Sequence, residues 1–214
     1  MNDRVVLPLQ AGLKLNLGCG QNKLDGYINV DRVANDKLHP DLQHDLETFP
    51  WPWPDDSVAE IRLHHVLEHL GQTPLRFLRI MVELYRVCAP GARIAIAVPH
   101  PRHDHFLGDP THVRVVTPEV LSLFSQANCA RWAEQGAANS PLAFQLRVDF
   151  EVRETRMILD EPHATAWARK EIGAAALAQL TRECNNVIKE IRMLLEVVKP
   201  AGSQCARNPG EAPA

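Results

Sequence analysis

The sequence predicts an α/β fold built on a mostly parallel sheet, and three observations support this prediction. Short apolar segments alternate with turns and with stretches that have helical spacing. The apolar segment near the middle of the chain, 93–98, carries little polarity, as expected for a strand that is covered on both faces. The length of 214 residues suits one domain with an appendage.

Five strands are expected in the first half of the chain, at 13–17, 27–30, 42–46, 58–63 and 93–98. A helix is expected from Thr73 to Cys88, because apolar residues recur there at helical spacing and Pro90-Gly91 follows. A helical turn at 65–70, a second helix at 118–126 and one or two strands within 144–159 complete the predicted domain, 1–160.

The C-terminal part of the chain shows a different period. Apolar residues recur every seven positions in two series: Leu177, Cys184, Ile191 and Val198, and Leu180, Val187 and Leu194. This seam predicts a long C-terminal helix within a helical extension, 161–199, and a homodimer paired through residues 177–198. Residues 200–214 are predicted to be a disordered tail.

Composition excludes several classes of protein. The net charge of -3 argues against a nucleic-acid partner. No apolar stretch approaches 18 residues, so no membrane span is expected, and the N-terminal residues lack the apolar run of a signal peptide. Five widely spaced cysteines without a C-x-x-C pair indicate a reducing compartment, and we expect a cytoplasmic protein.

Two motifs predict a ligand site at one edge of the sheet. The first expected strand ends in Gly18-Cys19-Gly20, and the second ends in Asp31. Glycines let the backbone approach a ligand closely, and an acidic residue in this place can accept hydrogen bonds from ribose hydroxyls. Lys23 stands where a dinucleotide-binding motif needs its third glycine, and no P-loop sequence follows.

Five short motifs in this order resemble the class I S-adenosylmethionine-dependent methyltransferases, over roughly residues 13–125. They are LNLGCG (15–20), NVD (29–31), HDLETFPWPWPDDSVAEI (44–61), HHVLEHL (64–70) and PGARIAIAVP (90–99). The resemblance implies a Rossmann-like, mostly parallel seven-stranded sheet with helices on both faces. It also implies S-adenosyl-L-methionine as cofactor and methyl transfer to a small polar acceptor, such as the hydroxyl of a sugar or another metabolite.

The resemblance also assigns eight cofactor-binding residues: Asn16, Gly18, Cys19, Gly20, Asp31, Asp45, Leu46 and His64. The glycine turn would hold the methionine part of the cofactor, Asp31 the ribose, and Asp45 with the Leu46 backbone the adenine. Asn16 replaces the usual acidic residue before the glycines and can still bond the amine end of the cofactor.

The connection between the first two strands departs from the family pattern. Only Gln21 to Gly26 separate Gly20 from Tyr27, whereas a parallel crossover normally needs about a dozen residues. The first helix is therefore expected to be shortened or absent. The alternative is a hairpin at Asp25-Gly26, which would make the second strand antiparallel.

Histidines gather near the ends of the fourth and fifth expected strands. Because such strand ends meet at one edge, four of them are candidates for accepting the proton of a hydroxyl: His65, His69, His105 and His112. The loop 109–119 is similar to a loop of bacterial methyltransferases that act on surface glycans and small metabolites. That similarity implies that Asp109, His112 and Arg114 shape the acceptor site, and we add His103 to this set.

Two other functions stay open at the level of sequence. His103, His105, Asp109 and His112 could ligate a metal ion in a metal-dependent enzyme, although their spacing matches no known metal signature, and no residue is assigned as a ligand. A methyltransferase-like protein without catalysis is the second alternative. It is favoured by the short first crossover and by Asn16.

Overall fold

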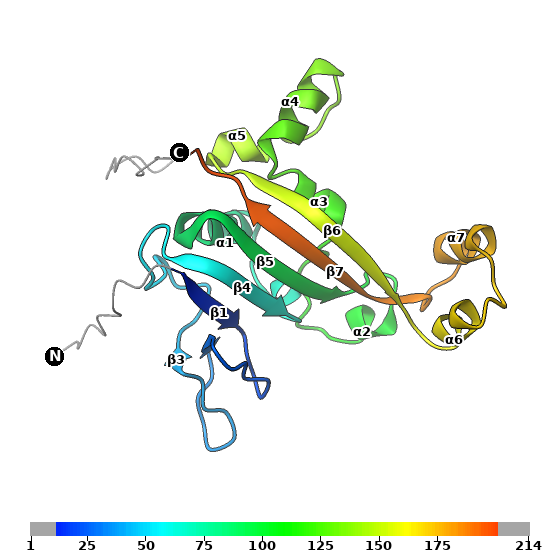
Figure 1. Ribbon diagram of the computed structural model, residues 1–214, viewed down its shortest axis with the longest axis horizontal. Coiled ribbons are helices and arrows are strands. Elements are labelled where there is room, and N and C mark those ends of the chain that lie inside the picture. The colour runs from blue at the N-terminus through cyan, green and yellow to red at the C-terminus, as the bar shows by residue number, and fades with distance from the viewer. Residues whose placement is uncertain (1–11, 201–214) are drawn as a thin grey trace.

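A computed structural model describes residues 12–200, and its centre is one seven-stranded sheet (Figure 1). The strands are β1 (Leu13–Leu17), β2 (Ile28–Asp31), β3 (Leu42–Gln43), β4 (Val58–His64), β5 (Cys88–Pro99), β6 (Phe150–Leu159) and β7 (Ile188–Val197). Their order is β3-β2-β1-β4-β5-β7-β6, with β1 to β5 parallel and β7 antiparallel to both of its neighbours. The predicted mostly parallel, Rossmann-like sheet is confirmed.

The helices are short except for the one between β4 and β5. They are η1 (Leu67–His69), α1 (Pro74–Val87), α2 (Asp104–Leu107), α3 (Pro118–Ser122), α4 (Gln126–Glu134), α5 (Leu142–Leu146), α6 (His163–Ala168) and α7 (Ala174–Glu183). Thr73 caps α1 by accepting a hydrogen bond from Arg76 N at 3.4 Å, and Pro74 fits the first helical position. The buried face of α1 includes Ile80 and Leu84, which pack in the core. None of the described helices is long and apolar enough to cross a membrane.

Residues across the sheet alternate between a buried face and an open one. Leu15, Ile61, Ile94 and Leu195 form one row across four strands, and each is fully buried. The adjacent row on the opposite face contains Arg62, which is exposed. The core therefore lies almost entirely on one side of the sheet.

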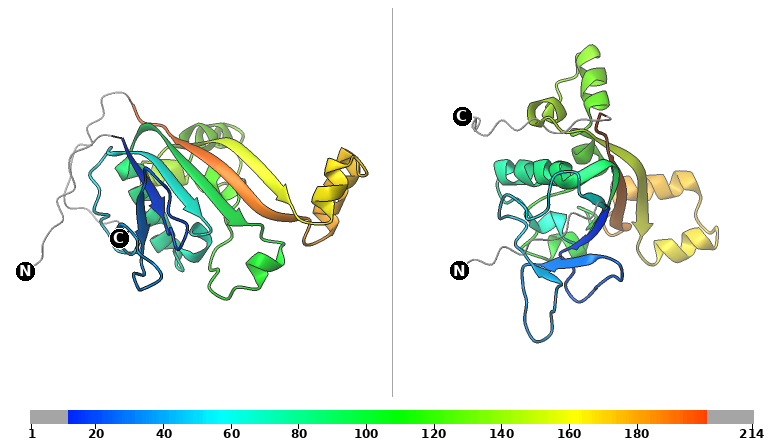
Figure 2. Two further views of the ribbon diagram at one scale, coloured as in Figure 1. Left: turned by 60° about the horizontal axis from the view of Figure 1, so that its bottom comes forward. Right: turned by 60° about the vertical axis from the view of Figure 1, so that its left-hand side comes forward.

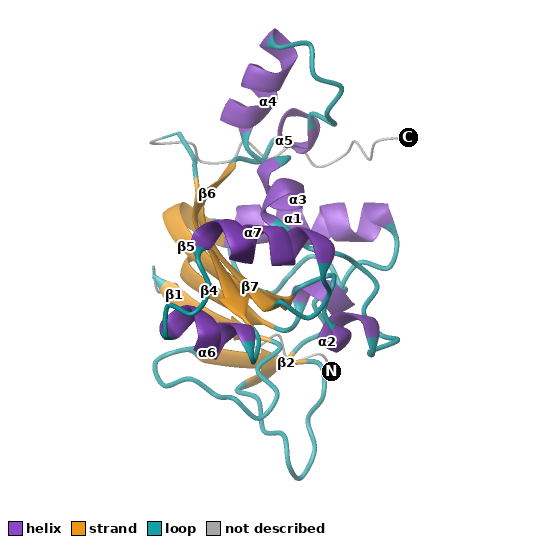
Figure 3. Ribbon diagram, turned by 90° about the vertical axis from the view of Figure 1, so that its right-hand side faces the viewer, coloured by secondary structure: helices purple, strands orange, loops and turns teal. Residues whose placement is uncertain are grey.

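The structure corrects the expectation of helices on both faces. Figure 3 shows α1, α2 and α3 on the same side of the strands. From β1 the chain moves to β2 and β3 toward one edge of the sheet, whereas from β4 it moves to β5 toward the other edge. Because crossovers between parallel strands are right-handed, the β1–β2 and β2–β3 connections lie on one face and the β4–β5 connection lies on the opposite face. In the described residues neither the β1–β2 nor the β2–β3 connection contains a helix, and this leaves the second face uncovered.

Side-chain hydrogen bonds hold the short β1–β2 connection without a helix. Asn16 Nδ2 donates to Asn22 O and to Asn29 Oδ1, both at 2.9 Å, and Asn29 Oδ1 also accepts from Leu24 N at 2.7 Å. Strands β1 and β2 are parallel, so the predicted loss of the first helix is confirmed and the hairpin alternative is wrong.

The long C-terminal helix is a wrong prediction, because Ile188–Val197 is strand β7, inserted between β5 and β6. Of the expected helical extension only α6 and α7 form, and they lie beyond the ends of β6 and β7 (Figure 2). The heptad seam expected to pair two subunits therefore does not exist as a helix, and its second half lies within the sheet. Most of the tail predicted at 200–214 lies outside the described residues.

Candidate functional site

A cleft of about 550 Å³ lies at the carboxyl ends of the central parallel strands, where ligands bind in open α/β sheets. It is lined by Gly18, Asp31, Arg32, His44, Asp45, Leu46, Glu47, His65, Val66, His69, Leu70, Gln72, Thr111 and Val113. The lining combines the end of β1, the end of β2, the loop after β3, the loop after β4 and the loop after α2. The topology thus brings together motifs that are nearly 100 residues apart in the sequence.

The glycine turn after β1 is required by its backbone and by its neighbour. Gly18 has a φ of +67°, and a Cβ at this position would lie 2.4 Å from Val66 Cγ2. Gly20 has a φ of +49°, and its N–H donates to Asp31 Oδ2 at 2.8 Å. The other oxygen of Asp31 accepts from Val33 N at 3.0 Å, so the carboxylate is fixed at the wall of the cleft.

A second part of the lining follows β3. Asp45 Oδ1 accepts from Glu47 N at 2.9 Å, and the carbonyl of Leu46 accepts from Trp51 Nε1 at 3.0 Å. Within residues 44–53, two buried polar atoms have no hydrogen-bond partner in the described part of the chain: Nε2 of His44 and Nε1 of Trp53. Burial lowers the pKa of His44. This imidazole therefore contributes an unpaired polar atom at the wall of the cleft.

Four of the eight residues expected to bind the cofactor are not in the lining: Asn16, Cys19, Gly20 and His64. Asn16 is buried in the hydrogen bonds that hold the β1–β2 connection, and the Cys19 side chain is 3% exposed, with a pKa raised by burial. His64 is exposed and lines a different hollow, of about 430 Å³, on the uncovered face of the sheet. Neither the glycine turn nor Asp31 reaches that hollow, so we place the candidate site in the cleft.

Two histidines beside the cleft have defined hydrogen-bond partners. Thr111 Oγ1 donates to Asp109 Oδ1 at 2.6 Å, so it accepts from His69 Nδ1 at 3.0 Å. His112 Nδ1 donates to the carbonyl of Phe106 at 2.8 Å, and the rings of His69 and His112 are 4.6 Å apart. In each neutral ring the proton is therefore on Nδ1, and Nε2 carries the lone pair.

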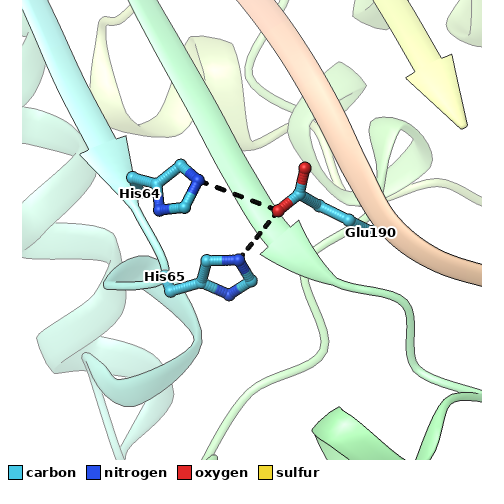
Figure 4. A group of neighbouring side chains, drawn as sticks. All are labelled: His64, His65 and Glu190. Carbon is cyan, nitrogen blue, oxygen red and sulfur yellow. Dashed lines mark hydrogen bonds and ion pairs between the residues drawn. The ribbon is translucent and has the colours of Figure 1, made fainter. Parts of the chain in front are cut away.

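His65 lies between two carboxylates. Its Nε2 donates to Glu190 Oε2 at 2.8 Å, as Figure 4 shows, and its Nδ1 is 3.4 Å from Glu68 Oε1. The carboxylate of Glu68, and to a smaller extent that of Glu190, raises the pKa of His65. The two oxygens of Glu68 are fully buried and have no hydrogen-bond partner in the described residues. The cationic form of His65 is thus favoured, which makes it a poor proton acceptor.

The remaining predicted residues have different positions. His103 is 3% exposed, caps α2 by accepting from His105 N at 3.0 Å, and bonds Asp160 Oδ2 through Nε2 at 3.0 Å. His105 is exposed and does not line the cleft. Arg114 donates to Gly71 O at 2.6 Å and lies 4.3 Å from the Phe77 ring centre, so it braces the loop.

The four residues considered as an alternative metal site, His103, His105, Asp109 and His112, do not form a group that could hold an ion. Two other groups in the described residues could hold an ion: His64, His65 and Glu190, and Glu68, His69 and His112. Sequence reasoning missed both glutamates. Glu68 stands directly before His69 but was given no place among the site residues, whereas Glu190 was hidden by the helical interpretation of its segment.

Comparisons with known proteins show the fold. No family model and no curated protein matches the chain. A SAM-dependent methyltransferase from Archaeoglobus fulgidus is 17% identical, with a TM-score of 0.56 over 88% of this chain and 87% of that one. A candidate S-adenosylmethionine-dependent methyltransferase from Listeria monocytogenes is 11% identical, with a TM-score of 0.50 over 90% of this chain and 94% of that one. The chain therefore has the fold found in these two proteins.

Proposed function

We propose that the protein binds S-adenosyl-L-methionine in the cleft and transfers its methyl group to a small polar acceptor, such as a hydroxyl of a sugar or another metabolite. The observation that carries the proposal is the glycine turn hydrogen-bonded to Asp31 at the cleft of a methyltransferase fold. Both features were expected for this cofactor from the order of the sequence motifs.

The cleft fits the cofactor in size and in chemistry. Its volume of about 550 Å³ falls in the range of small-molecule pockets. Asp31 uses one lone pair of each oxygen on the backbone, and each oxygen keeps another for a ribose hydroxyl. In this arrangement Gly18 faces the methionine part, and Asp45 and Leu46 face the adenine.

The protein mainly supplies orientation in such a reaction. When bound, the cofactor provides the electrophilic methyl group, and the chain must align an acceptor oxygen with it and exclude water. A hydroxyl acceptor must also lose its proton. Glu68, His69 and His112 carry free lone pairs next to the cleft, and they assist this step either directly or by lowering the pKa of the hydroxyl. His105 is exposed and belongs neither to the lining nor to the group of Glu68, His69 and His112, so we give it no part in the reaction.

The cofactor assignment is tested by calorimetric titration with S-adenosylmethionine and S-adenosylhomocysteine. We expect micromolar binding by the wild type and at least tenfold weaker binding by Asp31→Asn, which can still accept from Gly20 N but loses the charge. Asp25→Asn, an exposed acid in the same connection, is the matched control and should bind normally. Absence of wild-type binding would refute the proposal.

Turnover separates the enzyme from a binding protein of the same fold. Incubation of the protein with methyl-labelled cofactor and pooled polar metabolites should transfer label to a hydroxyl compound. Cofactor binding without transfer to any pool would favour the alternative of a non-catalytic binding protein, which the missing first helix and Asn16 support.

A further inference from the structure

We propose that Glu68, His69 and His112 form a binding site for one divalent transition-metal ion beside the cofactor cleft. One potential ligand atom of each residue lies within 4.8 Å of the other two. Two imidazoles and a carboxylate are a ligand set that suits zinc or ferrous iron. Bonds of about 2.0–2.2 Å to one ion require only small side-chain movements from this arrangement.

Glu68 provides the observation that points to a cation. Its side chain is fully buried, and neither of its oxygens accepts a hydrogen bond in the described part of the chain. A buried carboxylate is normally paired, hydrogen-bonded or bound to a metal, because leaving it bare costs several kcal/mol or more. The nearest charged partner is His65 Nδ1 at 3.4 Å, and His65 is shared with Glu190.

The two histidines are already oriented as ligands. Nδ1–H of His69 is held by Thr111, which is itself held by Asp109, and Nδ1–H of His112 is held by the Phe106 carbonyl. Such outer hydrogen bonds fix the tautomer of metal-binding histidines and leave Nε2 for the metal. Asp109 Oδ2 is 3.8 Å from His112 Nε2 and offers a fourth ligand within reach.

The second candidate group is a weaker ligand set. Glu190 in the group of His64, His65 and Glu190 accepts from Arg192 Nε and from His65 Nε2, so its charge is already compensated. His65 would also have to give up its proton to Glu190 before binding a metal. Glu68 has only the 3.4 Å contact with His65 Nδ1 and accepts no hydrogen bond in the described residues, and this difference favours the group of Glu68, His69 and His112.

His69 and Thr111 line the cleft, so an ion at this site could hold the oxygen of an acceptor and lower the pKa of its hydroxyl. That role rests on the proposed function, whereas binding of the ion does not. The two can therefore be measured separately, with metal binding followed in the absence of any cofactor or acceptor.

The test uses the full, untagged chain, stripped with a chelator and titrated with Zn²⁺ and with Co²⁺. We expect one equivalent to bind the wild type, with the intense visible absorption of four-coordinate Co²⁺ and a higher melting temperature. His112→Ala and Glu68→Gln should each weaken binding at least tenfold. His105→Ala, which removes an exposed histidine outside the group, and Glu190→Gln should bind like the wild type.

Three outcomes would overturn the metal site: no binding by the wild type, unchanged binding by His112→Ala, or a loss that occurs in Glu190→Gln instead. His69→Ala serves as a further variant if Glu68→Gln fails to fold, which circular dichroism will reveal. Calorimetry with S-adenosylmethionine in excess chelator distinguishes the two proposals. If the protein binds the cofactor under these conditions but fails to bind Zn²⁺ or Co²⁺ in the metal titration, the metal site is refuted and the cofactor site is not.

Discussion

The backbone N–H of Gly20 donates a 2.8 Å hydrogen bond to the carboxylate of Asp31, which joins the turn after β1 to the end of β2. In a sheet that lacks a helix between these strands, this contact and the asparagine hydrogen bonds of the β1–β2 connection do the positioning that a longer crossover would do. A cofactor-type cleft can therefore form with only six residues between Gly20 and Tyr27.

Gly18→Ala is expected to destabilise the protein more than Gly20→Ala. Both positions have positive φ, which costs a non-glycine residue about 1–2 kcal/mol. Only at Gly18 would the new Cβ also overlap Val66, at 2.4 Å, and overpacking adds about 1–3 kcal/mol. Urea denaturation of both variants measures the difference, and equal free energies of unfolding would contradict the Val66 contact.

Lys199 is expected to contribute more stability than an exposed lysine. Its side chain is 8% exposed, and Nζ donates to Asp56 Oδ1 and to Cys88 O at 2.6 Å. Lys199→Met should lower the free energy of unfolding by about 2–4 kcal/mol, because it removes a buried charge-assisted donor from the Cys88 carbonyl and from the half-buried Asp56 carboxylate. Lys23→Met removes an exposed pair with Asp41 and should cost at most about 1 kcal/mol. Similar losses in the two variants would show that burial is not the cause.

The cysteines should differ sharply in reactivity toward a thiol reagent under native conditions. Burial raises the pKa of Cys88 to about 12, whereas Cys184 is exposed. Because the thiolate is the reactive form, we expect iodoacetamide at pH 8 to label Cys184 within minutes and Cys88 only on unfolding. Peptide mass spectrometry reads out each site, and prompt native labelling of Cys88 would contradict its position in the core.

His103 is expected to stabilise the fold instead of binding the acceptor. His103→Ala removes the cap of α2 and the partner of Asp160, and we expect a loss of about 1–2 kcal/mol. His105→Ala, at an exposed position next to it, should have little effect. Thermal and urea denaturation measure both variants, and an acceptor KM raised by His103→Ala at unchanged stability would argue for a binding role.

The hydrogen-bonded pair of His103 and Asp160 should also make the stability of the protein depend on pH. His103 lowers the pKa of Asp160 below the usual 3.8, so ionised Asp160 stabilises the folded state. This stabilisation is fully present above the pKa that Asp160 has in the unfolded chain. It is lost as the pH falls through the lower pKa that Asp160 has in the folded protein. Asp160→Asn should therefore be less stable than the wild type at pH 5, with the gap closing below pH 3.8.

The parallel core could be predicted because its local signals agree. In β1 and β5, short apolar runs are bounded by glycine or proline. Pro90-Gly91 separates the predicted helix from the predicted strand 93–98, although in the structure β5 begins earlier, at Cys88, and includes both residues. Strand β7 was missed because apolar residues that recur every seven positions, as in a helix, obscured apolar residues that recur every two positions, as in a strand. Ile191, Met193, Leu195 and Val197 are buried and alternate with the less buried Arg192, Leu194 and Glu196, which is the pattern of a strand with one buried face.

The site was only partly predictable, since sequence gives strand ends but not the direction of side chains. Asp31 ends β2 and Asp45 follows β3, and both line the cleft; the end of a strand predicted the first, and the resemblance to methyltransferases implied the second. His64 and His65 are adjacent in sequence and both approach Glu190 Oε2, yet only His65 lines the cleft, because the chain leaves β4 after His64 and turns through a positive φ at His65. Glu190 needed the antiparallel register of β7, which no local motif encodes.

The uncovered face of the sheet also has a thermal consequence. Charged side chains such as Arg62 and Arg192 stay hydrated there in the folded state, so unfolding exposes less new apolar surface per residue than in a sheet covered on both faces. The heat capacity change of unfolding should fall below the usual value of about 12–15 cal/mol/K per residue. A smaller change flattens the dependence of stability on temperature, so the protein should lose little stability on cooling.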